Sequence, residues 1–287
     1  MKTNTLREKL RSGTPTIGGW LTLNNSALAE LMASVGYDWI VVDCEHSTIS
    51  FDDLLHICQG IDCAGNGAVP IARVATPDHA TMKRTLDTGV KGVVVPMLET
   101  PQQFEEAVAA ARFAPEGVRG ICSARANRWD MEFDEYTASA NSTIMVIAQI
   151  ERIKAVERIE EILAVDGIDA VVIGPDDLSA SMGYRGNSGH PDVTAAIDRV
   201  FEACRRANIP YGRHVMTVEA AVQHINMGCT FVPLSQDIDT FWEAALAMVN
   251  SVRNAVAAGS SAAGVLHVAS TQRLANPEAP DKSLNPV

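Results

Sequence analysis

The residues of this sequence that could do chemistry follow short apolar runs rich in β-branched side chains. The run DWIVVD ends in Asp43, and Glu45 and His46 come directly after it. A carboxylate three residues before a histidine can hold the imidazole in the orientation that a general acid or base needs. We therefore expect His46 to transfer protons with Asp43 as its partner, whereas a structural histidine in the core is the alternative.

Two further acidic residues, Glu151 and Asp177, follow the apolar runs IMVIAQI and DAVVIG. If the two carboxylates face each other, their repulsion raises the pKa of one of them unless a cation lies between them. Mg²⁺ and Mn²⁺ typically bind one or two carboxylates and take their other ligands from water and substrate. We expect Glu151 and Asp177 to bind such an ion, and solvated loop carboxylates are the alternative.

The stretch IGPDDLSASMG places Gly174 and Pro175 between an apolar run and a short helical pattern. Proline suits the first position of a helix, and the free backbone N–H groups there attract a carboxylate. We predict that Gly174, Pro175, Asp176 and Asp177 contact the carboxylate of a small substrate. Capping of the helix by Asp176 is an alternative that is compatible with this prediction.

Arg73 ends the apolar run AVPIARV, where an always-charged guanidinium is unusual. It could stabilise negative charge that develops on a substrate oxygen, or it could form a buried ion pair with Glu151. No lysine stands at the end of an apolar run, which disfavours a Schiff-base mechanism. A phosphorylated substrate is also disfavoured, because the last two runs do not end in a glycine-rich turn.

Eight apolar runs alternate with segments whose apolar residues have helical spacing. The runs cover residues 16–22, 38–43, 68–74, 92–97, 144–150, 169–174, 210–215 and 230–235. Strict alternation predicts a parallel sheet, and eight units in roughly 250 residues favour a closed (β/α)₈ TIM barrel over an open sheet. Active sites of such barrels lie at the carboxyl ends of the strands, where all the residues above are expected.

We predict one barrel domain over residues 1–258 and a C-terminal extension over residues 259–287, partly helical and partly disordered. The longest interruption, residues 113–143, is expected to carry function or a short helix of its own. Six scattered cysteines without a C-x-x-C pair indicate reduced, packing thiols.

The formal net charge of −12 argues against nucleic acid as a partner. We find neither a secretory signal nor an apolar run long enough to span a bilayer. The composition is therefore compatible with a soluble enzyme, and we expect a cytoplasmic location.

Several motifs together resemble the HpcH/HpaI family of metal-dependent, class II pyruvate aldolases. They are GYDWIVVDCEHS, PIARV, LDTGVKGVVVPM, GVRGICSARANRW, VIAQIE and VIGPDDLSASMGY, and the resemblance runs from about residue 5 to 250. It implies reversible cleavage of a 4-hydroxy-2-oxo acid to pyruvate, or a related 2-oxo acid, and an aldehyde. Oxaloacetate decarboxylation is an implied side activity.

The resemblance also implies roles for the residues that bind the metal and the oxo acid. Glu151 and Asp177 would bind Mg²⁺, Mn²⁺ or Co²⁺, and Gln149 would lie beside the metal and the oxo acid. Arg73 would stabilise the pyruvate enolate. Backbone N–H groups near Asp176 and Asp177 would hold the pyruvate carboxylate.

Proton transfer and assembly follow from the same resemblance. His46 and Asp43 would form the acid/base pair, acting through water, and Asp87 would reach this pair from a neighbouring subunit of a homohexamer that exchanges its last helix. Arg213 and His214 replace the small or apolar residues expected in the seventh strand, which predicts a more polar pocket wall and leaves the aldehyde open. The alternatives are an acyl-CoA lyase of the citrate lyase β-like group, which would need a basic channel, and a non-catalytic barrel that binds an oxo acid.

Overall fold

The computed structural model describes residues 4–258 of the chain. The predicted extension over residues 259–287 lies outside the described residues. The chain comprises two compact units, residues 1–238 and the remainder. All the strands belong to the first unit.

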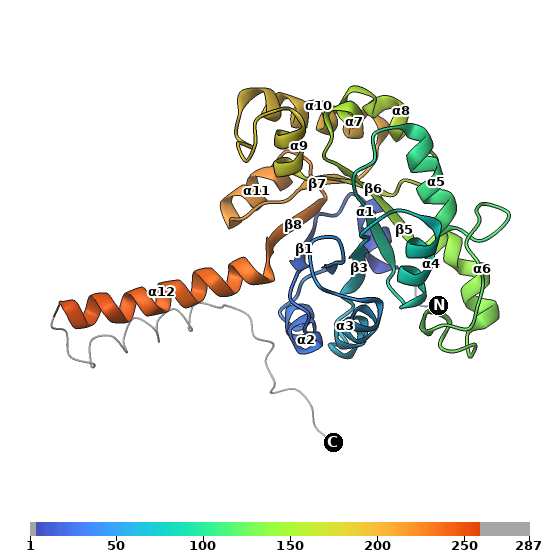
Figure 1. Cartoon of the computed structure of the whole chain (residues 1–287), viewed down its shortest axis with the longest axis horizontal. Helices are drawn as coiled ribbons and strands as arrows, with labels where there is room; N and C mark the ends of the chain where they lie inside the picture. The colour runs from blue at the N-terminus through green and yellow to red at the C-terminus, as the bar shows by residue number, and fades with distance from the viewer. Residues whose placement is uncertain (1–3, 259–287) are drawn as a thin grey trace, which may run out of the picture. The chain divides into compact units, whose positions relative to one another are not determined.

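Eight parallel strands form the centre of the first unit, with helices around them (Figure 1). The strands are β1 Thr16–Leu21, β2 Trp39–Asp43, β3 Val69–Arg73, β4 Gly92–Val95, β5 Met145–Ile150, β6 Ala170–Ile173, β7 Tyr211–Arg213 and β8 Phe231–Gln236. Each one lies within, or one residue beyond, a predicted apolar run. The predicted (β/α)₈ TIM barrel is confirmed.

Helices follow the strands in alternation, as predicted. Those before β5 are α1 Thr5–Arg11, α2 Ser26–Ser34, α3 Phe51–Cys63, α4 His79–Asp87, α5 Pro101–Ala111, the short 3₁₀ helix η1 Arg125–Asn127 and α6 Phe133–Thr143. Those after it are α7 Ile153–Glu157, α8 Ile159–Leu163, α9 Pro175–Ser181, α10 Pro191–Ala207, α11 Val218–Asn226 and α12 Asp237–Ala257. None of the described helices combines the length and the apolar character needed to cross a bilayer.

The sheet has the strand order β7-β6-β5-β4-β3-β2-β1-β8, so that β1 pairs with both β2 and β8. Between β7 and β8 the chain forms one isolated bridge, Val215 to Leu234. A Cβ atom on Gly212 of β7 would lie 1.6 Å from the carbonyl oxygen of Phe231 in β8. The barrel is therefore nearly closed, and a glycine permits the close approach of its last two strands.

Side chains of the strands alternate between two hydrophobic clusters. The interior cluster includes Trp39, Val41 and Ile71, and the outer cluster between strands and helices includes Ile40 and Val42. Leu6 and Leu10 of α1 also belong to the interior cluster. The alternation determines which polar residue of each strand end faces the mouth of the barrel.

The segment over residues 113–143 follows α5 and precedes β5, and it contains η1 and α6. The predicted short helix is confirmed. Because α5 runs antiparallel to the strands, this segment lies at their amino ends. Within one chain it is thus far from the carboxyl ends, where barrel active sites lie.

Candidate active site

An ion pair between neighbouring strands occupies the carboxyl end of the barrel. Asp43 of β2 and Arg73 of β3 are partners in strand register, so their side chains point to the same side. Arg73 Nε lies 2.9 Å from Asp43 Oδ1, and Arg73 Nη2 lies 2.6 Å from Asp43 Oδ2. Both side chains are largely buried. The bidentate bond fixes the guanidinium plane at the mouth.

Asp43 also organises the turn that follows β2. Its Oδ1 atom accepts hydrogen bonds from the backbone N–H groups of Glu45, at 3.0 Å, and of His46, at 3.2 Å. Burial raises the pKa of Asp43, but Arg73 and these two N–H groups outweigh burial and hold the pKa below its ordinary value. Asp43 is thus an ionised anchor for both Arg73 and the turn.

Within residues 4–258, the Asp43 carboxylate forms no hydrogen bond with the His46 imidazole, contrary to the prediction. Its oxygens instead accept hydrogen bonds from Arg73 and from backbone N–H groups. The His46 side chain is 63% exposed, and its Nε2 atom lies 3.8 Å from Glu45 Oε2. Glu45 Oε2 is buried without a hydrogen bond, 3.3 Å from Arg73 Nε. Burial raises the pKa of Glu45, Arg73 lowers it and Glu151 raises it further. Glu45 is therefore the carboxylate nearest to the imidazole.

Glu151 is a buried carboxylate, 1% exposed, directly after β5. Its Oε1 atom accepts the backbone N–H of Met97 at 2.6 Å, and its Oε2 atom accepts a hydrogen bond from the Gln149 amide. Burial is the main reason that its pKa is raised, and Asp177 contributes to the rise. Asp177 acts in the predicted direction, although burial is the larger cause.

The turn after β6 brings the other predicted residues to this carboxylate. Gly174 precedes α9, which begins at Pro175 and carries the exposed Asp176 and Asp177 in its first turn. A Cβ atom on Gly174 would lie 2.9 Å from Glu151 Oε2. The absence of a side chain at Gly174 therefore lets the turn approach the buried carboxylate.

The family was identified by comparison with known proteins. The model of the HpcH/HpaI aldolase/citrate lyase family matches residues 16–244. The chain belongs to the HpcH/HpaI family. Its members include aldolases, and the chain is accordingly a carbon–carbon lyase that performs aldol cleavage to pyruvate and an aldehyde.

Relatives within the HpcH/HpaI family carry two different aldolase names. A 4-hydroxy-2-oxo-heptane-1,7-dioate aldolase of Shigella sonnei is 37% identical over 247 residues, which are 85% of this chain and 93% of the relative. A 2-keto-3-deoxy-L-rhamnonate aldolase of Salmonella gallinarum is 37% identical over 88% of this chain and 95% of the relative. A solved family member from Burkholderia cenocepacia has a TM-score of 0.85 at 34% identity, over 88% of this chain and all of that one.

Two site residues had not been predicted. Trp20 of β1 is 8% exposed, and its ring lies 4.6 Å from Arg73 Cζ. It stands two residues before the end of the predicted run TIGGWLT, and this position near the end of a strand is the only signal that could have indicated it. Met97 acts through its backbone N–H with a left-handed φ of 64°, for which its side-chain type gives no signal. Both residues orient the charged groups of the mouth.

The predicted polar wall of the seventh strand is half correct. Arg213 is the register partner of Ile173, whose side chain lies in the outer cluster, so Arg213 faces the helices and not the pocket. His214 is the next residue and faces the interior, where its ring lies edge-on to Trp20 with 6.5 Å between centroids. Strand alternation, which reverses the side at every residue, explains the difference.

Asp87 lies apart from the other predicted residues. It ends α4 and therefore lies near the amino ends of the strands, where its carboxylate binds Arg119 Nη2 at 2.9 Å. Arg119 is buried, with its guanidinium 4.7 Å from the ring of Phe113. Asp87 cannot reach His46 of its own chain across the barrel.

The donor set near Glu151 fits a hard divalent cation. Glu151, Asp177 and the amide of Gln149 offer only oxygen ligands, which Mg²⁺ and Mn²⁺ prefer. Among residues 4–258 no group of three or more histidine, cysteine or acidic side chains could enclose a metal. An ion held by two carboxylates would thus keep positions for water and substrate.

Proposed function

We propose that the mouth of the barrel cleaves 4-hydroxy-2-oxo acids to pyruvate, or a related 2-oxo acid, and an aldehyde, with a divalent cation held by Glu151 and Asp177. The observation that carries the proposal is the presence of two buried charged groups at the carboxyl ends of the strands. They are the carboxylate of Glu151, 1% exposed, and the guanidinium of Arg73, which two hydrogen bonds to Asp43 hold in place. When bound, the cation supplies Lewis-acid stabilisation of negative charge on the substrate oxygens.

Arg73 stabilises the enolate that bond cleavage leaves behind. Its Nε and Nη2 atoms are bonded to Asp43, whereas Nη1 makes no hydrogen bond with a described residue. The Nη1 group can therefore donate to a substrate oxygen without losing a protein contact. Because the guanidinium is already oriented, this interaction needs little reorganisation during the reaction.

His46 takes the proton of the 4-hydroxyl group through a water molecule and returns it in the synthetic direction. Its high exposure leaves the ring accessible to water and substrate. Asp43 positions His46 through the backbone bond at 3.2 Å, and Glu45 is its nearest carboxylate. Asp87 of a neighbouring subunit completes the proton-transfer site.

The substrate carboxylate binds at the turn formed by Gly174, Pro175, Asp176 and Asp177, next to the amide of Gln149. The backbone N–H groups of the first turn of α9 are the donors. Gly174 supports this location, since its missing side chain leaves room beside Glu151. Oxaloacetate decarboxylation is a side activity of the same site, because it leaves the same enolate.

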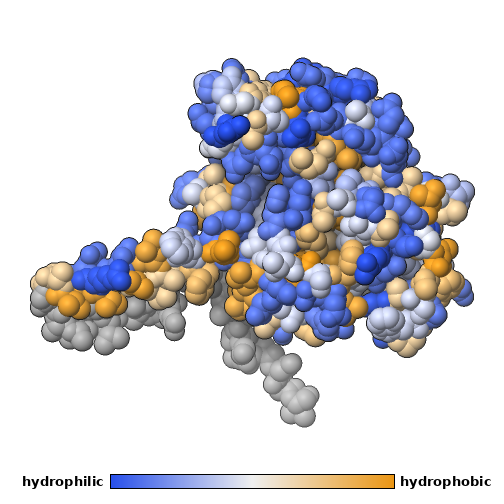
Figure 2. Space-filling model, viewed as in Figure 1, coloured by the Kyte–Doolittle hydropathy of each residue, from blue (hydrophilic) through white to orange (hydrophobic). Residues whose placement is uncertain are grey.

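A cytoplasmic homohexamer that exchanges its last helix is part of the proposal. Hydrophobic side chains run along α12 (Figure 2), among them Phe241 at 72% and Trp242 at 65% exposure. Within the first unit, α2 and α11 also expose apolar side chains, including Leu31 at 59% and Val218 at 65%. Exposed apolar faces of this extent support contacts between copies of the chain.

The proposal is tested by aldol turnover in a titration of Mg²⁺, Mn²⁺ and Co²⁺. We expect Glu151→Gln and Asp177→Asn each to lower kcat/KM by a factor of about 100 or more and to weaken metal binding, since each removes a charged ligand. Asp134→Asn, an exposed acid of α6, is the control and retains activity. Full activity of both ligand variants in EDTA would exclude the metal role. Acidic and neutral hydroxyaldehydes as acceptors then identify the aldehyde.

A further inference from the structure

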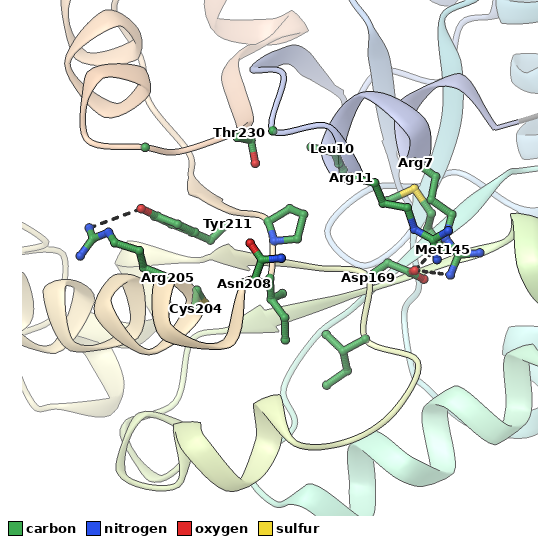
Figure 3. A pocket seen from close by; sticks show the side chains of 15 residues that line it. Arg7, Leu10, Arg11, Met145, Asp169, Cys204, Arg205, Asn208, Tyr211 and Thr230 are labelled. Atoms are coloured by element: carbon green, nitrogen blue, oxygen red, sulfur yellow. Dashed lines mark hydrogen bonds and ion pairs between the residues drawn. The ribbon is translucent and has the colours of Figure 1, made fainter.

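A cavity of about 510 Å³ lies at the end of the barrel opposite the mouth (Figure 3). Its walls come from α1, from the amino ends of β5 to β8 and from the end of α10. No residue of the proposed active site lines it. Its volume is in the range of pockets that bind small molecules, roughly 300–1,000 Å³.

The lining of this cavity is basic, in contrast to the net charge of −12 for the whole chain. Arg7, Arg11 and Arg205 line it together with one carboxylate, Asp169. Arg7 Nε donates to Asp169 Oδ1 at 2.9 Å, and Arg112, behind the wall, lies 3.6 Å from Oδ2. One carboxylate thus faces two guanidinium groups, and the charges of Arg11 and Arg205 have no carboxylate partner among the described residues.

Arg7 and Arg11 are four residues apart on α1, so their side chains project from the same face of the helix. Both line the cavity, and Figure 3 shows them on one side of it with Asp169. Like charges at this spacing repel each other on a helix. An anion bound between the two guanidinium groups would convert this repulsion into attraction.

Arginines near helix C-termini often serve to compensate the last carbonyl groups. At the end of α1, however, these carbonyls accept backbone hydrogen bonds from residues 12–14, and at the end of α10 they accept them from Asn208 and Ile209. Arg11 and Arg205 make no hydrogen bond to the carbonyls. The hydrogen-bonding needs of the helix ends therefore do not account for the two arginines.

The far wall of the cavity carries a second set of polar groups. Arg205 Nη2 lies 3.4 Å from the hydroxyl oxygen of Tyr211, which is a weak contact that a stronger acceptor could replace. In Figure 3 Arg205 and Tyr211 lie on the side of the cavity away from Arg7 and Arg11. Anion-binding groups at both ends suit an elongated ligand.

We propose that this cavity binds an elongated small molecule with an anionic group, phosphate or carboxylate, at each end. Arg7 and Arg11 bind one group, and Arg205 binds the other. Because Leu6 and Leu10 of α1 belong to the interior cluster, the ligand would fasten the helix that packs into the base of the barrel. A ligand that binds only the folded state raises the melting temperature.

The test uses metal-free protein, calorimetric titration and thermal melting, with inorganic triphosphate and adipate as the phosphate and carboxylate probes. We expect Arg11→Gln and Arg205→Gln each to weaken binding of the preferred probe about tenfold, which corresponds to the loss of one charged hydrogen bond. Lys9→Gln and Arg206→Gln are matched controls on the same two helices, since their side chains bind Asp38 and Glu160 outside the cavity. These controls should bind like the wild type.

Binding that survives in Arg73→Met locates the site away from the mouth, so this test is independent of the proposed function. The proposal is wrong if neither probe binds the wild-type chain, or if Arg73→Met that circular dichroism shows to be folded no longer binds either probe. It is equally wrong if the two controls weaken binding as much as Arg11→Gln and Arg205→Gln, because general charge attraction would then explain the result.

Discussion

At the scale of single residues, Asp43 connects Arg73, which is proposed to stabilise the enolate, with His46, which is proposed to transfer protons. One carboxylate holds the guanidinium of Arg73 and, through two backbone N–H groups, sets the turn that carries His46. A change at either partner of this buried pair leaves the other charge without compensation. The pair is therefore expected to affect stability as well as catalysis.

Arg73→Met should lower the free energy of unfolding by about 3–5 kcal/mol near neutral pH, because it leaves a buried carboxylate unpaired. In the wild type the lowered pKa of Asp43 means that its stabilisation is present above the unfolded pKa and is lost as the pH falls through the folded one. In the variant, burial and the two backbone N–H groups remain but the guanidinium is gone, so the pKa of Asp43 is higher than in the wild type and its protonation in acid relieves part of the loss. The deficit should shrink in acid.

Urea unfolding of both proteins at about pH 7 and about pH 4.5 measures this difference. Arg128→Met, which removes an exposed pair with Glu132, is the control and should cost at most about 1 kcal/mol at either pH. A deficit for Arg73→Met that stays constant with pH would contradict the role of Asp43.

Trp20 supports the face of the Arg73 guanidinium. We expect Trp20→Leu to lower kcat about 3- to 30-fold, as the loss of a partly desolvated cation–π contact implies. Trp129→Leu, at a side chain that is 61% exposed, is the matched control and should leave kcat unchanged. Steady-state kinetics with saturating metal separate kcat from KM, and an unchanged kcat in Trp20→Leu would show that the ring does not position Arg73.

The sequence places the candidate residues at the ends of apolar strands because polar side chains are conspicuous there, and their roles stay predictions. It could not predict the partner of Asp43, since both a histidine in the same turn and an arginine on the next strand were within reach. Strand register decides in favour of Arg73. The contribution of Met97 is a backbone group, for which the sequence carries no signal.

At the scale of elements, the closure of the barrel depends on Gly212 of β7. We expect Gly212→Ala to destabilise the fold by about 3 kcal/mol or more, because its Cβ atom would overlap a backbone oxygen that cannot move without separating the strands. Gly120→Ala is the control, with only the Lys83 side chain nearby, at 3.5 Å. Equal unfolding free energies of the two variants would show that the strands can separate freely.

The eight strands were predictable because each is a short run of β-branched residues bounded by turn signals. Gly36, Gly89 and Gly228, which follow helices in the sequence, have left-handed φ angles of 107°, 99° and 96°. The helix α1 was not predicted, since only Leu6 and Leu10 of its seven residues are buried. Its place comes from tertiary packing against the base of the barrel.

At the scale of the whole molecule, alternation of strand and helix was enough to predict the barrel. Assembly of several copies of the chain depends instead on contacts between subunits, which the sequence of one chain does not determine. Asp87 shows the limit most clearly. The sequence resemblance assigns it to proton transfer, but in its own chain it lies at the other end of the barrel from His46. Only a neighbouring subunit can bring the two residues together.

Mixed assemblies test this arrangement. We expect the His46→Ala and Asp87→Asn variants each to have low aldolase activity alone. When subunits of the two variants are unfolded together and reassembled, activity should return, because some interfaces then pair an intact His46 with an intact Asp87. A mixture of His46→Ala with Arg73→Met is the control and should stay inactive, because both residues belong to the mouth of one chain and every mouth in this mixture carries one of the two defects. Aldol turnover of the two mixtures gives the answer. Equal activities would place Asp87 outside the proton-transfer site.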